Sequence, residues 1–190
     1  RRADAIVRDL LYLSAARQIE IEPHDINAVL EHSLSYVNYD LIRSRVLVFR
    51  ALAKDLPAVR VDKAKMEQVF INLFMNAIQA MPNGGDLFLR TSRGVWDGVT
   101  GPESPMAKFQ AGDPVVVIEV EDTGAGIPAD KLARVFEPFF TTKANGIGTG
   151  LGLPVSKQIV DLHGGTIQLS AGTRGGARAT ITLKIQQEQP

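Results

Sequence analysis

The sequence predicts one α+β domain, and three observations support that fold class. The chain of 190 residues is 45% hydrophobic and 22% charged, which is enough apolar content to bury one substantial core. Two segments, 62–81 and 151–162, repeat their apolar residues at the period of an α-helix. Short apolar runs before, between and after these helices are bounded by turn residues and predict the strands of a sheet.

The charge balance and the composition exclude several classes of partner. Lys plus Arg and Asp plus Glu each number 21, so no basic excess would draw the chain to nucleic acid or to an anionic membrane. The absence of cysteine excludes disulfides and thiolate chemistry. Apolar runs such as 115–118 are too short to span a bilayer, and the first residues lack the apolar stretch of a signal peptide. We therefore expect a soluble domain.

The first segment predicts a short amphipathic helix followed by a linker. Apolar residues recur three or four positions apart in this segment, at Ala3, Ile6, Leu10 and Leu13. Such a stripe suits either a partner helix in a bundle or the packing of the helix on its own domain. Residues 20–23 end in Pro23, which predicts a short linker and a domain boundary.

Two helices and two strands follow the linker. Asp25 is a suitable N-cap for a helix with the inward-facing residues Ile26, Val29, Leu30, Leu34 and Val37. Residues 46–49 and 58–61 predict strands. Asp62 is a suitable N-cap for a longer helix, and its apolar face consists of Met66, Val69, Phe70, Leu73, Phe74, Ala77 and Met81. We expect that face to be buried.

The polar flank of the longer helix carries two asparagines, Asn72 and Asn76, one turn apart on the same side. One interpretation is an ordinary solvated face. Asparagine is a mediocre helix former, however, and a solvated face would more naturally use Glu, Lys or Arg. The pair therefore favours a functional role, because amide carbonyl oxygens are suitable ligands for a hard cation.

A glycine-rich turn follows the next two predicted strands, 87–89 and 115–120. It has the sequence Asp122-Thr123-Gly124-Ala125-Gly126. Its aspartate could accept a hydrogen bond from the amine of a base, or it could simply cap the helix that follows. The turn also matches a dinucleotide-binding glycine pattern, but Pro128 fixes the backbone there and no repeated βαβ pattern surrounds it, so that interpretation is disfavoured.

Two further segments complete the candidate site. The phenylalanines of Phe136 to Lys143 suit either the hinge of a loop that closes over a ligand or a satellite of the core. Gly146 to Gly152 opens a helix with Pro154 in its first turn and Gly164 as its C-cap. Free N–H groups at such a helix start can bind phosphates, so the motifs together predict ATP with magnesium. Strands 166–169 and 179–185 complete the sheet.

In combination these motifs resemble the ATP-binding catalytic domain of two-component sensor histidine kinases, within the superfamily of gyrase, heat-shock chaperone and MutL ATPases. The matching elements are the asparagine box at 72–77, the first glycine box at 122–128, the phenylalanine box at 136–143, the second glycine box at 148–153, and a terminal element at Gly175, Gly176 and Thr180. The form of residues 138–143 is most similar to nitrogen-regulation type kinases.

The resemblance implies a fold and two domains. The fold is a two-layer α/β sandwich of the histidine kinase ATPase type, in which a mixed sheet carries helices on one face. Residues 1–22 would be the end of the dimerisation and phosphoacceptor helix pair with its linker. Residues 23–190 would be the ATP-binding catalytic domain.

The resemblance also implies a role for each matching residue. Asn76 would hold Mg²⁺, with Asn72 in support of the cation site, and Asp122 would bind the adenine amine. Asn72 and Lys143 would serve catalysis, Lys143 by reaching the phosphates from a lid. The other implied ATP contacts are Gly124, Gly126, Ile127, Phe136, Thr142, Gly148, Thr149, Gly150, Leu151, Gly152, Leu153 and Thr180.

The chain departs from the family pattern in two respects. Gln79 and Ala80 stand where many of these kinases have a basic residue and then often an aromatic one, which would place more of the phosphate charge on the lid lysine and on magnesium. No histidine stands in a phosphoacceptor context: His24 lies in the linker, His32 on the polar side of a helix, and His163 at a helix C-terminus where a positive charge would suit the dipole. We therefore expect a fragment of a longer kinase.

The implied activity is transfer of the γ-phosphoryl group from magnesium ATP to a histidine on an upstream helical domain, and from there to the receiver domain of a response regulator. One alternative is a hydrolytic ATPase, which is disfavoured because Asn72 stands where those enzymes carry a glutamate. Another is a nucleotide-sensing module without catalysis. We expect a cytoplasmic location, no nucleic-acid partner and no direct membrane contact by this chain, whether or not the longer protein is anchored.

Overall fold

The computed structural model describes residues 19–97, 109–141 and 149–186. The predicted N-terminal helix, most of the excursion between the two central strands, and the end of the phenylalanine segment lie outside these residues. None of the helices in the described part of the chain is both long and apolar enough to cross a bilayer.

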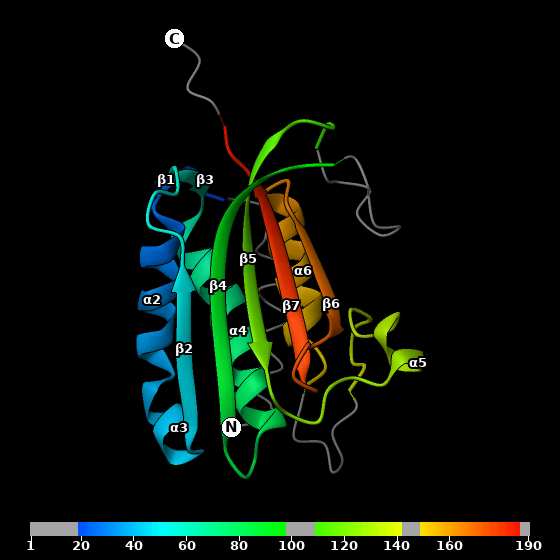
Figure 1. The fold of residues 1–190 in the computed structure, drawn as a ribbon. Helices are drawn as coiled ribbons and strands as arrows, with labels where there is room; N and C mark the ends of the chain where they lie inside the picture. The colour runs from blue at the N-terminus through cyan, green and yellow to red at the C-terminus, as the bar shows by residue number, and fades with distance from the viewer. Residues whose placement is uncertain (1–18, 98–108, 142–148, 187–190) are drawn as a thin grey trace.

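The described residues form a two-layer α+β sandwich. One layer is a five-stranded sheet in the order β2-β4-β5-β7-β6, and a separate two-stranded sheet pairs β1 with β3. Helices α2, α4 and α6 lie side by side on one face of the larger sheet (Figure 1). The elements are β1 (Glu22–His24), α2 (Ile26–Tyr36), α3 (Asn38–Arg43), β2 (Val46–Leu52), β3 (Val59–Val61), α4 (Lys63–Ala80), β4 (Gly85–Val95), β5 (Pro114–Asp122), α5 (Ala129–Leu132), α6 (Gly152–Leu162), β6 (Thr166–Ala171) and β7 (Ala177–Lys184).

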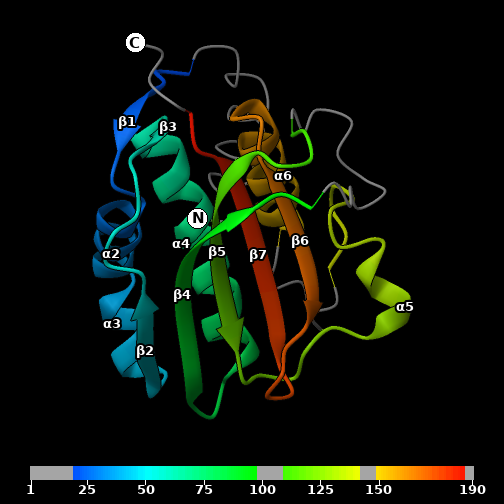
Figure 2. The same cartoon turned by 45° about the horizontal axis from the view of Figure 1, so that its top comes forward.

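The sheet is mixed, as predicted. β2 runs parallel to β4, whereas the β4–β5, β5–β7 and β6–β7 pairs are antiparallel. The view turned by 45° (Figure 2) shows α4 and α6 behind the central strands, and α5 beyond the β6 edge. The predicted fold class is thus confirmed.

The helix starts predicted from aspartates are also confirmed. The Asp25 side chain accepts from the N–H of Asn27, and the Asp62 side chain accepts from the N–H of Lys65. Every residue of the predicted apolar face of α4 is buried, so helical periodicity identified the core side of this element. At the end of α6, Gly164 has a φ of 68°, and its N–H and that of Gly165 return to the carbonyls of Asp161 and Val160, which terminates the helix.

The linker predicted at residues 20–23 is partly wrong, because Glu22 and Pro23 belong to strand β1. This strand pairs with β3, so β3 lies outside the main sheet. An extended linker beside another short strand satisfies its backbone groups by pairing with it. Proline is tolerated there because an edge strand needs no N–H on its open side.

His163 also differs from its predicted role. Burial lowers the pKa of its imidazole, so the charge that would suit the helix dipole is disfavoured. The ring instead joins the end of α6 to the start of α4, through a hydrogen bond from the Asp62 N–H to Nε2.

Strand alternation decides which residues of β5 and β7 can reach the helices. Val120 and Asp122 share the face of β5 that is covered by helices, and Glu119 and Glu121 share the opposite face. In β7, Ala177 and Ala179 face the helical layer, and Arg178 and Thr180 face away from it. The candidate site forms on the helical side, where β5 ends.

Candidate functional site

A cavity of about 340 Å³ lies between the helical layer and the sheet. That volume is within the usual range for small-molecule sites, roughly 300–1,000 Å³. The walls come from α4, from the start of α6, from β5, β6 and β7, and from residues 126–141. Nine of the predicted site residues line it: Asn72, Asn76, Asp122, Gly126, Ile127, Thr149, Gly150, Gly152 and Leu153.

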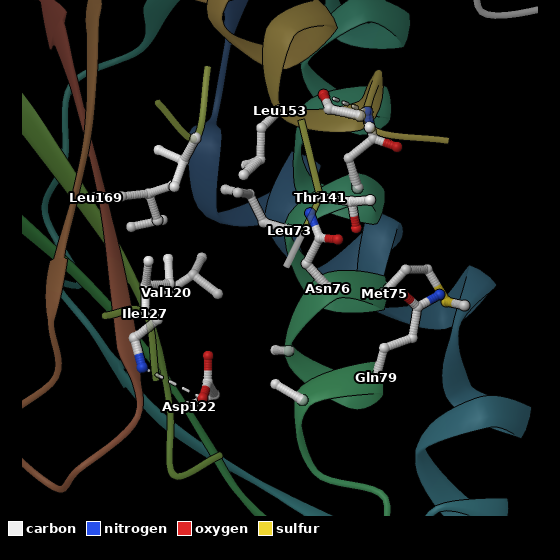
Figure 3. A pocket seen from close by; sticks show the side chains of 18 of the residues that line it. Leu73, Met75, Asn76, Gln79, Val120, Asp122, Ile127, Thr141, Leu153 and Leu169 are labelled. Carbon is white, nitrogen blue, oxygen red and sulfur yellow. Dashed lines mark hydrogen bonds between the residues drawn. The ribbon is translucent and has the colours of Figure 1, made fainter. Parts of the chain in front are cut away.

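One part of the cavity is apolar. Figure 3 shows Leu73, Leu153 and Leu169 pointing toward one another, with Val120 and Ile127 nearby. These side chains come from α4, α6, β6, β5 and the loop that follows β5. Apolar walls drawn from opposite layers suit a flat aromatic ring, because both faces of the ring would be removed from water.

Asp122 is the only carboxylate among the residues that the structure describes around the cavity, and it is only 6% exposed. Its Oδ1 accepts from the N–H of Gly124 at 2.8 Å and from the N–H of Ala177 at 3.3 Å. None of the described residues donates a hydrogen bond to Oδ2, so this oxygen can accept from a ligand. Burial raises the pKa of this carboxyl, although the two backbone donors oppose the shift. A ligand amine would stabilise the ionised form.

The two asparagines of α4 have different surroundings. The Nδ2 of Asn72 donates to the Gly152 carbonyl at 3.3 Å and to the Ser156 Oγ at 3.4 Å, which ties α4 to the first turn of α6. Asn76, one turn later, also lines the cavity. Its amide carbonyl is of the type that Mg²⁺ accepts as a ligand.

The donor set fits a cation held jointly by the protein and by phosphates. Within residues 19–97, 109–141 and 149–186, no three His, Asp or Glu side chains are grouped to hold a metal ion. Magnesium is usually bound through one or two protein ligands, the substrate phosphates and water rather than by a complete protein cage. The lining amide of Asn76 satisfies this requirement.

The first turn of α6 borders the cavity, and no side chain in the described part of the chain caps it. Leu151 occupies the N-cap position without a capping hydrogen bond, while Gly152, Leu153 and Pro154 line the cavity. Pro154 has no N–H, so this turn offers the N–H groups of Gly152 and Leu153, and none of the described side chains is bonded to them. Both lie at the positive end of the helix dipole, an arrangement suited to phosphate groups. Thr149 helps to position the backbone that leads into α6, because its Oγ1 accepts from the Leu151 N–H at 3.3 Å.

A backbone hydrogen bond joins the glycine run at Gly150 to the phenylalanine segment at Phe139. The N–H of Phe139 donates to the Gly150 carbonyl at 2.9 Å. Gly150 has a φ of 66°, and a Cβ there would overlap the backbone of Phe139. Only glycine permits this approach without a shift. The segment therefore packs against the end of the cavity that is formed by the glycine run and the first turn of α6.

Some predicted contacts have other positions. Gly124 lies beside the cavity and acts through its hydrogen bond to Asp122. The Leu151 side chain is fully buried, so only its backbone can meet a ligand. Phe136 packs against the core, and Phe140 lines the cavity instead. The expected contact of Thr180 with ATP needs correction. Its side chain lies on the face of β7 opposite the cavity, because side chains alternate along a strand.

Three predicted residues, Thr142, Lys143 and Gly148, lie outside the described residues. Other lining residues were not predicted as site residues, and they are Leu73, Met75, Ala77, Gln79, Ala80, Val120, Val135, Phe140, Thr141, Pro154, Leu169, Ala177 and Ala179. Alternation could have identified Val120, two residues before Asp122. Ala177 and Ala179 could be found only once the β5–β7 register was known.

Comparison with known proteins gives consistent results. Residues 61–187 match the family described as histidine kinase-, DNA gyrase B-, and HSP90-like ATPase. The chain is 39% identical over 185 residues to sensor histidine kinase ZraS from Escherichia coli O157:H7, a match that covers 97% of this chain and 36% of that relative. The chain thus spans about a third of the length of this curated relative.

Solved structures show the same fold. Full-length ShkA in complex with AMPPNP superposes with a TM-score of 0.76 at 23% identity, over 96% of this chain and 36% of that chain. Histidine kinase ThkA in complex with response regulator protein TrrA superposes with a TM-score of 0.74 at 22% identity, over 100% of this chain and 49% of that chain. At these identities the likeness concerns the fold alone.

Proposed function

This chain belongs to the histidine kinase-, DNA gyrase B- and HSP90-like ATPase family as the ATP-binding catalytic domain of a histidine kinase, and we propose that it transfers the γ-phosphoryl group of magnesium ATP to a histidine on a separate helical domain. The observation that carries this proposal is the pairing of a buried carboxylate, Asp122, with an uncapped helix start in one partly apolar cavity. The carboxylate can accept a hydrogen bond from the adenine amine, and the helix start can bind phosphates.

The proposed roles follow the chemistry of the cavity. Asp122 accepts from the adenine amine through Oδ2, and Leu73, Leu153 and Leu169 surround the ring. The backbone of the first turn of α6 binds the phosphates. Asn76 holds magnesium, which would neutralise phosphate charge when bound. The resemblance of the motif implies that Lys143, which lies outside the described residues, would reach the phosphates from a lid.

The reaction needs little covalent chemistry from this domain. The bond between the γ-phosphorus and the oxygen of the β-phosphate breaks, a bond between phosphorus and an imidazole nitrogen forms, ADP leaves, and the imidazole releases one proton. Catalysis of such a transfer comes mainly from positioning and charge neutralisation. These are the functions that the proposed residues can supply.

The environment of Asn72 favours a kinase over a hydrolytic ATPase. Hydrolysis requires a group that takes a proton from water. Asn72 stands at the position of that group, yet its amide donates to Gly152 and Ser156 and cannot act as a base. A nucleotide sensor without catalysis remains a distinct alternative, and a transfer assay separates it from a kinase.

We further propose the setting of this domain. The acceptor histidine would belong to a dimerisation and phosphoacceptor domain to which residues 1–22 are the connection, with 23–190 as the catalytic domain. The next partner would be the receiver domain of a response regulator, and the location would be cytoplasmic. Neither nucleic acid nor a membrane surface would be a partner of this domain.

The test is phosphotransfer in trans. The chain is incubated with radiolabelled ATP and a separately produced acceptor helical domain at high concentration, because tethering normally supplies a high effective concentration. We expect acid-labile label on the acceptor and little label on this chain. Rapid release of free phosphate without labelled acceptor would support hydrolysis instead. Binding of ATP with neither labelled acceptor nor released phosphate would support a nucleotide sensor without catalysis. Near-stoichiometric label on His24, His32 or His163 would contradict the proposal.

A further inference from the structure

Glu121 is a buried carboxylate that the proposed mechanism does not use. Its side chain is 0% exposed although it lies on the face of the sheet away from the helices. Oε2 accepts from Arg90 at 2.9 Å and from Arg178 at 3.0 Å and 3.2 Å. With two further bonds from Thr173, Glu121 accepts five charge-assisted hydrogen bonds in all. These bonds explain how a carboxylate can be buried there in the ionised form.

The two bonds from Thr173 connect Glu121 to the turn between β6 and β7. Oε1 accepts from the Thr173 N–H at 2.7 Å and from its Oγ1 at 2.6 Å. The turn is closed by a bond from the Gly172 N–H to the Gly176 carbonyl at 2.7 Å. Glu121 therefore holds the 172–176 turn against the end of β5.

The other side of this turn contacts Asp122. The N–H of Ala177 donates to Oδ1 of Asp122 at 3.3 Å, and Gly176 lies so close to Asp122 that a Cβ would overlap its backbone oxygen. The turn also reaches the first glycine box, since a Cβ at Gly126 would come within 2.9 Å of the Gly175 carbonyl. The turn thus places the second of the two N–H donors on Oδ1 of Asp122, beside that of Gly124.

We propose that Glu121 is a positioning residue for adenine recognition: through Thr173 it holds the 172–176 turn so that the Ala177 N–H joins that of Gly124 on Oδ1 of Asp122, which orients the carboxylate with Oδ2 toward the adenine amine. Glu121 and Asp122 are consecutive residues on opposite faces of β5, and the turn wraps around the strand end to link them. Figure 3 shows Asp122 at one end of the cavity, beside Ile127. This inference rests on the proposed contact of Asp122 with adenine.

Glu119 provides a matched control. It lies on the same strand and face, and it pairs with the same two arginines, at 3.8 Å to Arg90 and 3.3 Å to Arg178. Its carboxylate makes no hydrogen bond to residues 172–176, all of which the structure describes. Removing its charge therefore disturbs the arginine cluster but leaves the link to Asp122 intact.

The experiment compares the affinities of two nucleotides by titration calorimetry. ATP carries the 6-amine, and purine riboside triphosphate lacks it. Thr173→Val and Glu121→Gln are expected to weaken ATP binding by about three- to tenfold, the effect of one impaired hydrogen bond, with little change for the amine-free nucleotide. Thr173→Ser and Glu119→Gln should retain the wild-type ratio of the two affinities.

The outcomes separate this inference from the proposed function. If the wild-type protein does not prefer ATP over the amine-free nucleotide, the assignment of Asp122 is wrong and this inference falls with it. If the wild type prefers ATP and Thr173→Val keeps the full preference, only the positioning role is overturned. Equal losses for both nucleotides in Glu121→Gln and Thr173→Val would show a merely structural role and would also overturn it. Thr173 is exposed, so its variants remain informative if Glu121→Gln does not fold.

Discussion

The Nε2 atom of His163 accepts a hydrogen bond of 2.9 Å from the backbone N–H of Asp62, joining the end of α6 to the N-cap of α4 across 101 positions of sequence. Nδ1 of the same ring lies 2.7 Å from the Ile159 carbonyl, which can only accept. The proton must therefore be on Nδ1, and the ring is neutral. This bridge holds together the two helices that wall the cavity.

The bridge predicts a dependence of stability on pH. Burial lowers the pKa of His163 in the folded state, so the unfolded chain, with a histidine pKa of about 6.5, binds the proton more readily. The contribution to stability is complete above that pH and is lost as the pH falls through the lower, folded pKa. Urea unfolding at pH 7.5 and pH 5.5 should show the loss.

His163→Gln should reduce this loss, since the variant has no group to titrate there, at a cost of about 1 kcal/mol at pH 7.5 for the impaired hydrogen bonds. The loss should persist in His32→Gln, in which the bridge is intact. An unchanged pH dependence in His163→Gln would show that the acid sensitivity arises elsewhere.

Asp122→Asn should raise stability while it weakens ATP binding. Burial raises the pKa of this carboxyl in the fold, so at neutral pH the ionised form costs folding free energy, and an amide avoids that cost. The amide nitrogen would oppose the adenine amine, and affinity should fall by about tenfold or more. Thermal unfolding and calorimetric titration measure the two effects. Asp130→Asn, at an exposed acid of α5, should change neither.

Guanine nucleotides should bind far more weakly than adenine nucleotides. Asp122 would face the carbonyl oxygen of guanine where adenine has its amine, so two acceptors would oppose each other in a buried site. We expect a difference on the order of a hundredfold or more. Competition of GTP against a fluorescent ATP analogue provides the measurement, and equal competition by GTP and ATP would contradict the adenine assignment.

Asn76→Ala should affect binding chiefly when magnesium is present. The lost amide is proposed as a cation ligand, so the affinity for magnesium ATP should fall by about tenfold, with a smaller change in excess chelator. Gln68→Ala, about two turns before Asn76 on the same helix and not among the residues that line the cavity, is the control. A loss of the same size with and without magnesium would assign Asn76 to the nucleotide itself.

Gly176→Ala should disrupt the site through its backbone. The new Cβ would overlap the main-chain oxygen of Asp122, which forces the turn or the strand end to move at a cost of about 1–3 kcal/mol. ATP affinity should fall together with stability. Gly94→Ala is the matched substitution, because the nearest atom to its Cβ is a Val115 methyl at 3.7 Å. Normal ATP affinity in Gly176→Ala would show that the turn can move without consequence for Asp122.

The sequence alone determined the local elements and the family. Asp25 and Asp62 as helix caps, the buried face of α4 and the end of α6 at Gly164 follow from residues within one or two turns of each other. The glycine and asparagine motifs were sufficient to indicate a histidine kinase ATPase domain, which the family match confirms. Such signals lie within short windows of the chain, so periodicity identifies the elements and the resemblance of the motifs identifies the family.

Only the tertiary structure decided how the motifs act on one another. The bond from Ala177 to Asp122 spans 55 positions and that from Asn72 to Gly152 spans 80. The pairing of β1 with β3, the outward direction of Thr180 and the neutral state of His163 likewise depend on distant partners. Strand register and helix packing set these contacts, and a shift of one residue would turn every side chain of a strand to its other face. Local sequence does not encode that choice, because the whole buried core determines it at once.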